Sequence, residues 1–376
     1  MTLVYERPGD GPRVHVLAIG VGAYRHLPGG SEEVPHNTLG LRQLSGPPAS
    51  AKAFTRWIVA NLRHPRAELG TVELLLSPEE AWAPDGEPAV PVERPSMANV
   101  LAAFERWYRR CDEDSGNVAL FYFCGHGVER ESPFLLLEDF GRSEMSLLEN
   151  AVDIGETYAG MARCAAGAQY FLVDACREIP FELTQLLNGN ARVLVDPRLV
   201  GDDRQETALL FATSGGAKAY GRAGRPTRFT EAVLSALGGL GGRYDGRRWV
   251  VDYLGLQRAA TILLRRGPGG PPAQRPTVLG AGEGVLHVCS TPPVVPVAIS
   301  CDPTAAVAAA RAAVAPVLPA GAASVVPAPV ADGWTVELPA DVYMLTLEFP
   351  AGDFQPMTEK IIAYPPRYDS RVAVSP

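Results

Sequence analysis

The sequence predicts an α/β fold, a three-layer α/β/α sandwich around a mostly parallel central sheet, followed by a small β module. Two apolar runs, 118–124 and 169–174, are hydrophobic on both faces, as strands buried inside a parallel sheet are. Segments with apolar residues at helical spacing alternate with such runs. A Pro-, Ala- and Val-rich stretch then changes the composition. We therefore expect a main domain over 1–290, a linker or the start of the C-terminal module over 291–331, and an antiparallel β module over 332–376.

The elements follow from periodicity and from capping residues. Ser50 and Ser96 each precede a helical pattern and are expected to be N-caps. We expect loops over 26–48 and 77–95, where Pro, Gly or acidic residues gather. In the main domain the expected strands are 14–21, 71–76, 118–124, 134–138, 169–174 and 207–213, and the expected helices are 51–62, 96–111, 153–166, 229–240 and 253–266. In the C-terminal part we expect strands at 334–338, 342–349 and 358–364, and one short helix within 304–315.

The composition excludes several classes of protein. The 376 residues include 34 Lys and Arg against 42 Asp and Glu, a net charge of −8, which argues against a nucleic-acid partner. None of the six cysteines forms a CxxC pair, which argues against a zinc knuckle. The N-terminus lacks the pattern of a signal peptide, and no apolar run reaches the roughly 20 residues of a membrane span. We expect a cytoplasmic protein with reduced thiols and no membrane partner.

Reactive residues follow the two apolar runs directly. The first run ends in His126 between two glycines, and the second ends in Asp174 and Cys176. Chemistry gathers beyond the carboxyl ends of parallel strands, so both residues are expected at one edge of the sheet. An unassisted thiol is only a few per cent ionised at neutral pH, and a neighbouring imidazole supplies the missing activation. The pattern therefore indicates a cysteine nucleophile with a histidine base.

Two further features of these runs suit acyl transfer. The backbone N–H groups of Gly127 and Cys176 are candidates for an oxyanion hole. Asp174 lies two residues before Cys176, so on an extended strand both side chains point the same way. Its carboxylate could then form the floor of a pocket for a cationic side chain, although an aspartate at this position could also simply cap a turn. Cys124, which has no acid two residues before it, is expected to be a packing residue.

The two boxes resemble those of the caspase-like cysteine peptidases of clan CD, with prokaryotic caspase homologues, metacaspases and paracaspases the most similar. The resemblance is carried by Tyr-Phe-Cys-Gly-His-Gly at 122–127 and by Val-Asp-Ala-Cys-Arg at 173–177. It extends to the first strand with Tyr24, to Leu-Leu-Phe-Ala-Thr-Ser at 209–214, and to the helix that opens at 229. It covers about residues 12–290 and implies a caspase-like fold for that region.

The resemblance also implies roles for individual residues. His126 would be the base and Cys176 the nucleophile, with the amides of Gly127 and Cys176 as oxyanion donors. Asp174, Tyr24 and Ser214 would contact the substrate. The arginine- and lysine-specific branches carry an acid where Asp174 stands, so we expect cleavage after Arg or Lys in a protein or peptide substrate. No cofactor and no metal ligand is expected, although activation by calcium, as in metacaspases, is left open.

Four points remain open at this stage. Metacaspases usually carry His-Ser where this chain has Arg177 and Glu178, so Arg177 could repel a basic substrate residue or pair with Glu178. The arginines at 192, 198 and 204 could be sites of self-processing or ordinary loop residues. The alternative to a peptidase is a catalytically silent caspase-like scaffold that acts by binding partners. The C-terminal β module could be a docking element for a partner, or it could cover the site.

Overall fold

Contacts divide the chain into two compact units. The computed structural model describes residues 2–83, 88–184, 191–197, 206–216, 223–265, 273–280, 284–317, 324–325, 329 and 333–376. The first unit comprises Met1–Leu234 and Ala260–Val288, and the second comprises Ser235–Ala259 and Cys289–Pro376. The second unit thus takes in Ser235–Ala259 in addition to the residues after 290 that the composition set apart.

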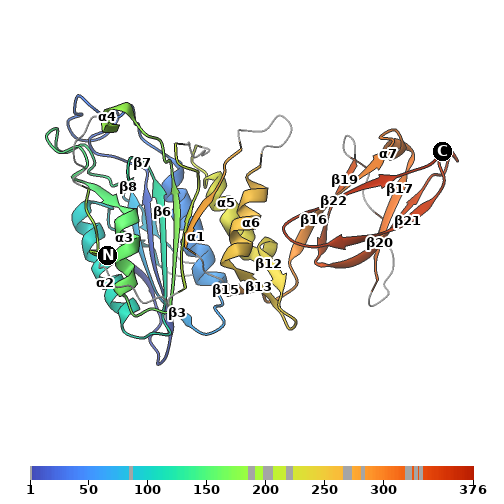
Figure 1. Cartoon of the computed structure of the whole chain (residues 1–376), viewed down its shortest axis with the longest axis horizontal. Coiled ribbons are helices and arrows are strands. Elements are labelled where there is room, and N and C mark those ends of the chain that lie inside the picture. The colour runs from blue at the N-terminus through green and yellow to red at the C-terminus, as the bar shows by residue number, and fades with distance from the viewer. Residues whose placement is uncertain are drawn as a thin grey trace. The chain divides into compact units, whose positions relative to one another are not determined.

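A seven-stranded sheet forms the centre of the first unit (Figure 1). Its inner neighbours pair in parallel, while the two edge strands pair antiparallel to theirs. This confirms the predicted α/β class and the mostly parallel sheet. The strands, in spatial order, are β1 (Leu3–Glu6), β3 (Glu68–Ser77), β2 (Arg13–Val21), β6 (Val118–Gly125), β10 (Ala168–Ala175), β11 (Glu206–Phe211) and β14 (Thr277–Gly280).

Helices cover both faces of this sheet, which gives the expected three layers (Figure 1). On one face, Phe54 of α1 (Gly46–Asn61) stacks on Tyr122 of β6 with ring centroids 4.3 Å apart, and the hydroxyl of the same tyrosine lies within hydrogen-bond distance, 2.6 Å, of the Thr230 hydroxyl on α5 (Arg228–Ser235). On the other face lie α2 (Met97–Asp112) and α3 (Ile154–Gly160), where Trp107 packs edge-on against Phe171 of β10.

The two predicted N-caps have different outcomes. Ser96 caps α2 as expected, since its Oγ accepts a hydrogen bond from the N–H of Asn99 at 3.4 Å. Ser50 does not cap α1. That helix begins earlier, after Ser45, with prolines in its first turn, where a missing N–H costs nothing. Ser50 instead lies buried inside the helix and accepts a hydrogen bond from the N–H of Thr227.

Shorter elements complete the first unit. A three-stranded sheet follows His126 directly: β7 (Gly127–Glu129), β8 (Pro133–Leu136) and β9 (Ala151–Asp153). The region 77–95, expected as an exposed loop, contains the hairpin β4 (Ala81–Trp82) and β5 (Val90–Pro91), whose Trp82 is only 1% exposed. The remaining elements are the 3₁₀ turn Met161–Arg163, α4 (Phe181–Thr184), α6 (Tyr253–Leu263), which continues from the second unit, and β15 (Val285–Val288).

The second unit contains a β-sandwich with its own hydrophobic core. Most strand pairs are antiparallel, as predicted, but β16 (Val294–Asp302) and β22 (Tyr368–Ala373) pair in parallel. The expected helix within 304–315 is confined to α7 (Ala306–Ala309), and Arg311–Pro316 form the strand β17. One sheet is β19 (Gly333–Pro339), β16 (Val294–Asp302) and β22 (Tyr368–Ala373), and the other is β18 (Ser324–Val325), β17 (Arg311–Pro316), β20 (Asp341–Glu348) and β21 (Met357–Ala363). The unit also holds the π-helical turn Ala236–Leu240 and the hairpin β12 (Gly242–Tyr244) and β13 (Trp249–Asp252).

Candidate active site

His126 and Cys176 leave adjacent parallel strands at the same level. In the register of β6 and β10, Asp174 lies opposite Cys124 and Ala175 opposite Gly125, so His126 and Cys176 are the next residues on each side. Both line one cavity of about 250 Å³. The other residues around this cavity are Leu39, Leu41, Gly127, Val128, Glu178, Ile179 and Pro180. The structure therefore brings the imidazole and the thiol to one open pocket at the carboxyl edge of the sheet.

The backbone N–H and the ring of His126 are each held by a hydrogen bond, and its carbonyl accepts from the N–H of Leu136 at 3.0 Å. Its backbone N–H donates to the phenolic oxygen of Tyr24 at 2.7 Å, and its ring Nε2 lies 2.6 Å from the backbone carbonyl of Arg42. A neutral imidazole that donates from Nε2 keeps a lone pair on Nδ1, which can accept a proton from a thiol. Burial lowers the pKa of His126, while the Arg42 carbonyl and the Glu178 carboxylate oppose that shift. The ring is therefore set up as a base at neutral pH.

Gly127 lies in contact with the backbone that carries the thiol. A β-carbon at this position would come within 2.6 Å of the carbonyl oxygen of Cys176 and within 2.9 Å of the β-carbon of Ala175. Real β-carbons essentially never approach so closely, and the nearer atom is backbone, so a side chain here would force the two segments apart. The two amides expected to form the oxyanion hole thus belong to segments that touch.

Asp174 is buried and does not line the cavity. The carboxylate is 2% exposed, and its Oδ2 accepts hydrogen bonds from the hydroxyls of Thr227 and Thr230 at the start of α5. Its Oδ1 has no hydrogen-bond partner among the residues that the structure describes. Burial raises the pKa of this carboxyl, and the threonine hydroxyls oppose the shift. Asp174 thus lies against α5 with one oxygen available to a donor.

Arg177 points away from the cavity. Its guanidinium bonds to Glu129 of β7 and to the hydroxyl of Thr277 at 3.0 Å, and it lies 4.4 Å from the ring centroid of Phe211. Of the two alternatives left open for Arg177, pairing with Glu178 is not observed, since its ion-pair partner is Glu129. The side chain instead contacts residues of β7, β11 and β14, which are Glu129, Phe211 and Thr277. Glu178 instead lines the cavity.

Tyr24 and Ser214, expected to contact the substrate, do not line the cavity. Tyr24 is fully buried, its ring centroid lies 5.0 Å from that of His126, and burial raises its pKa. Its contacts are those of a residue that supports the histidine. Ser214 is half-buried in the turn after β11, where the N–H of Gly216 donates to the carbonyl of Arg177 at 2.6 Å. It therefore lies beside the segment that follows Cys176.

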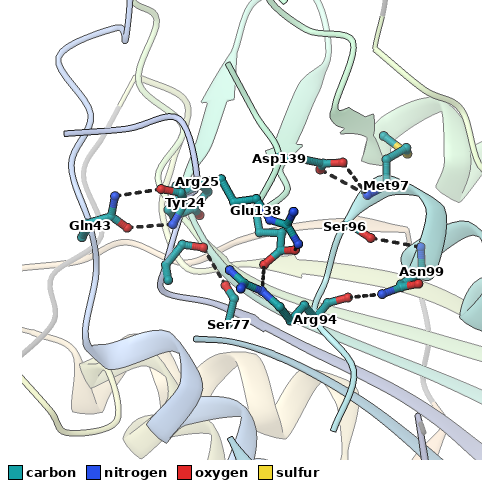
Figure 2. Close-up of polar contacts among 11 residues, drawn as sticks. Tyr24, Arg25, Gln43, Ser77, Arg94, Ser96, Met97, Asn99, Glu138 and Asp139 are labelled. Atoms are coloured by element: carbon teal, nitrogen blue, oxygen red, sulfur yellow. Dashed lines mark hydrogen bonds and ion pairs between the residues drawn. The ribbon is translucent and has the colours of Figure 1, made fainter. Parts of the chain in front are cut away.

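An ion-pair network around the buried carboxylate of Glu138 continues from Tyr24 (Figure 2). Glu138 is fully buried and accepts hydrogen bonds from Arg25 at 3.0 Å and from Arg94 at 2.6 Å. Its backbone carbonyl also accepts from the N–H of Arg25 at 2.8 Å. Arg94 leads directly into the capped start of α2, where Asn99 bonds to its carbonyl. The loop that supports His126 is thus joined to a helix on the far face of the sheet.

The chemistry available at the site comes from the thiol and the imidazole. Cys176 is half-buried, and none of the six cysteines, all of which lie in the described ranges, forms a disulfide. Cys124, only 1% exposed, is a packing residue whose thiol pKa is raised by burial and by Asp174. Within the described ranges, no group of three or more His, Cys, Asp or Glu residues could hold a metal ion. In the same ranges, no helix is long and apolar enough to cross a membrane.

Comparison with known proteins places this site in a family. The model of the caspase domain matches residues 14–250, which include both strands that end in His126 and Cys176. The chain belongs to the caspase family. His126 and Cys176, which follow neighbouring parallel strands, both lie within the matched region.

Relatives of this caspase-family chain are distant. It is 29% identical over 235 residues to an uncharacterized protein, y4kE, of Sinorhizobium fredii, which covers 60% of this chain and 68% of that protein. It is 26% identical over 181 residues to a probable protease of a Desulfuromonadales bacterium, covering 45% of this chain but only 20% of that protein. It is also similar to the crystal structure of caspase-1 from Spodoptera frugiperda, with 11% identity, a TM-score of 0.43, and coverage of 76% of this chain and 97% of the other.

Sequence reasoning missed several residues that support the candidate site. Arg42 contributes through its backbone carbonyl, which no side-chain pattern reveals. Thr227 and Thr230 show the spacing of an N-cap and the third residue of a helix, and Thr227 does accept from the N–H of Thr230 at 3.1 Å. That spacing predicts the cap but not the contact with Asp174. Nothing in the sequence marks Glu129 as a residue near the site, apart from its position three residues after His126.

Proposed function

We propose that the protein is a cysteine endopeptidase that uses His126 as base and Cys176 as nucleophile. The observation that carries the proposal is the placement of both side chains on one cavity at the ends of neighbouring strands. Membership of the caspase family supports the reaction class. The nucleophile is half-exposed, and the base is buried and held by hydrogen bonds, as this chemistry requires.

The reaction would proceed in two stages. In the first, His126 accepts the thiol proton and the Cys176 sulfur attacks the scissile carbonyl carbon, with the oxyanion held by the amides of Gly127 and Cys176. His126 then gives the proton to the leaving amine as the C–N bond breaks. In the second stage, water loses a proton to His126 and attacks the thioester, which releases the acid and restores the thiol. Each oxyanion donor is worth roughly 3–4 kcal/mol of the barrier.

A basic residue on the acyl side of the scissile bond is the finer part of the proposal. Asp174 lies two residues before the nucleophile and has a buried oxygen with no hydrogen-bond partner in the described part of the chain. A guanidinium or ammonium that enters beside it would favour the ionised carboxylate. Arg177, the basic residue closest to Cys176 in the chain, is engaged by Glu129 and Thr277. Glu178 adds an acidic group to the cavity.

Self-processing is part of the same proposal. Of the three candidate arginines, those at 198 and 204 lie outside the described residues. Arg192 has an exposed side chain, but its N–H donates to Ala151 and its carbonyl accepts from Asp153, at 2.7 and 2.9 Å. Cleavage at Arg192 would first have to separate this segment from β9. Calcium activation, a cytoplasmic location, the metacaspase subgroup and a docking partner for the β-sandwich stay predictions.

Fluorogenic peptides test the proposal directly. Purified full-length protein should cleave substrates with Arg or Lys before the reporter, and should cleave the matched Asp peptide far more slowly. Cys176→Ala should abolish turnover and leave the unfolding transition unchanged, because the side chain is half-exposed. If wild type shows no turnover above the background of Cys176→Ala, the proposed peptidase function is removed and the scaffold alternative is left. N-terminal sequencing of both proteins reports self-processing in the same preparation.

A further inference from the structure

Gln43, in the loop between β2 and α1, bonds to Tyr24 and directly follows Arg42, and both of these residues accept a hydrogen bond from His126. The amide of Gln43 accepts a hydrogen bond from the N–H of Tyr24 at 2.7 Å and donates one to the carbonyl of the same residue at 2.9 Å (Figure 2). The same amide nitrogen lies 3.1 Å from the carbonyl of Leu27. The first two bonds reproduce a pair of β-ladder bonds, with a side-chain amide in place of a second strand. They hold residue 43 against the end of β2.

The acceptors of the His126 backbone N–H and ring Nε2 both lie next to this contact. Tyr24, which Gln43 holds by its backbone, accepts from the His126 N–H through its phenolic oxygen. Arg42, whose carbonyl belongs to the peptide group shared with Gln43, accepts from the imidazole Nε2 at 2.6 Å. One other backbone bond holds the end of this loop, from the N–H of Leu44 to the carbonyl of Gly22 at 2.8 Å. A shift of Gln43 would therefore move the carbonyl that orients the ring.

We infer that Gln43 is a positioning residue for the histidine–cysteine pair. It does not line the cavity, and it acts through Arg42 and Tyr24. Without its amide, the Arg42 carbonyl would be free to leave the ring, and the imidazole would lose the bond that leaves Nδ1 as the proton acceptor. This role concerns the geometry of the pair. It rests on the proposed function only for its effect on peptide cleavage, and not for its effect on the reactivity of the thiol.

The reactivity of Cys176 toward iodoacetamide, measured against pH in the full chain, tests this inference without a peptide substrate. Peptide-resolved mass spectrometry separates Cys176 from the other five cysteines. The variants are Gln43→Ala, the isosteric Gln43→Glu and His126→Ala. Gln355→Glu serves as the matched control, because that exposed amide bonds only to the carbonyl of Pro376 at 3.4 Å among the described contacts. Buried Cys111, Cys124 and Cys164 report local unfolding of the first unit.

Gln43→Ala should lower the neutral-pH alkylation rate of Cys176 about tenfold, the effect of a tenfold loss of thiolate. Its pH profile should approach that of His126→Ala. Gln43→Glu should fall between Gln43→Ala and wild type, since a carboxylate still accepts from the Tyr24 N–H but no longer donates to the Tyr24 carbonyl. The three buried thiols should stay protected, and Gln355→Glu should match wild type.

A wild-type profile in both Gln43 variants would overturn the inference, and so would a profile that does not respond to His126→Ala. If Gln43→Ala exposes the buried thiols, the isosteric Gln43→Glu decides: a wild-type profile there contradicts positioning, and a shifted profile with protected thiols supports it. A protein that cleaves no peptide but shows the Gln43-dependent profile would lose the proposed function and keep this inference.

Discussion

The phenolic oxygen of Tyr24 lies 2.7 Å from the backbone nitrogen of His126 and accepts its hydrogen bond. Tyr24 follows β2, and His126 follows β6, the strand that pairs with β2. The two rings also touch, with centroids 5.0 Å apart and planes at 44°. The tyrosine therefore contacts both the backbone and the ring of the histidine and restricts the movement of each.

Tyr24→Phe removes this acceptor and leaves the N–H of His126 buried without a partner. An orphaned buried donor costs about 1–3 kcal/mol, so we expect a loss of stability in that range. We also expect kcat to fall more than KM rises, because the histidine acts in the chemical steps. Tyr343→Phe is the matched control, since it removes a buried hydroxyl that bonds to the carbonyl of Pro339 in the second unit. Equal kcat values for wild type and Tyr24→Phe would contradict the account.

Gly127→Ala places a β-carbon where the carbonyl oxygen of Cys176 already lies. Because that oxygen belongs to the backbone, the two segments must separate, and the proposed oxyanion donors move with them. Losing one such donor costs roughly 10²–10³ in kcat, and we expect a loss of that order. Gly238→Ala, where a new methyl group meets nothing within 4 Å, should leave kcat unchanged. An active Gly127→Ala variant would show that this contact does not position the amides.

Asp174→Asn should change how stability depends on pH. Burial raises the folded-state pKa of this carboxyl above its ordinary value of 3.8. The folded protein thus favours the protonated form of Asp174. The contribution of this carboxyl to stability is fully present below about pH 4 and is lost as pH rises through the raised pKa. Asparagine cannot ionise, so the stability of the variant relative to wild type should grow as pH rises above 4. Urea unfolding across that range measures it. A difference that grows toward acid would contradict the predicted direction.

His15 should destabilise the folded protein as pH falls, whereas Asp174 destabilises it as pH rises. Burial, together with Arg110 and Arg13, lowers the pKa of its imidazole from 6.5 to about 4. The neutral form is therefore favoured in the folded state, so this stability is present above pH 6.5 and is lost as pH falls toward 4, by up to about 3 kcal/mol. His15→Gln should reduce the loss of unfolding free energy between pH 6.5 and 4. Parallel stability curves for both proteins would rule the histidine out.

The central strands could be predicted because their cause is local. The runs that became β6 and β10 are apolar on both faces, and this pattern alone requires burial on both sides. Since parallel strands end at one edge, the sequence also predicted that His126 and Cys176 would meet there. Ser96 was identified as a cap for the same reason, since its hydroxyl serves its own helix.

The remaining features depend on contacts that the sequence does not show. The segment after Ala309 has strong helix formers, but Ala312 and Val314 alternate into the core of the sandwich, so tertiary packing selects a strand. The support of His126 by the Arg42 carbonyl uses only backbone. The partner of Arg177 is Glu129, 48 residues away in the chain, rather than its neighbour Glu178, and only the folded edge of the sheet brings these side chains together.

The most direct test of the histidine–cysteine pair is covalent labelling with a peptidyl acyloxymethyl ketone that carries arginine at its reactive end. The Cys176 sulfur should displace the carboxylate leaving group and form a thioether, which mass spectrometry locates on the peptide containing Cys176. Wild type should be labelled at this cysteine alone, and His126→Ala should react far more slowly. Labelling of another cysteine, or equal rates for wild type and His126→Ala, would contradict the claim that these two residues form one catalytic unit.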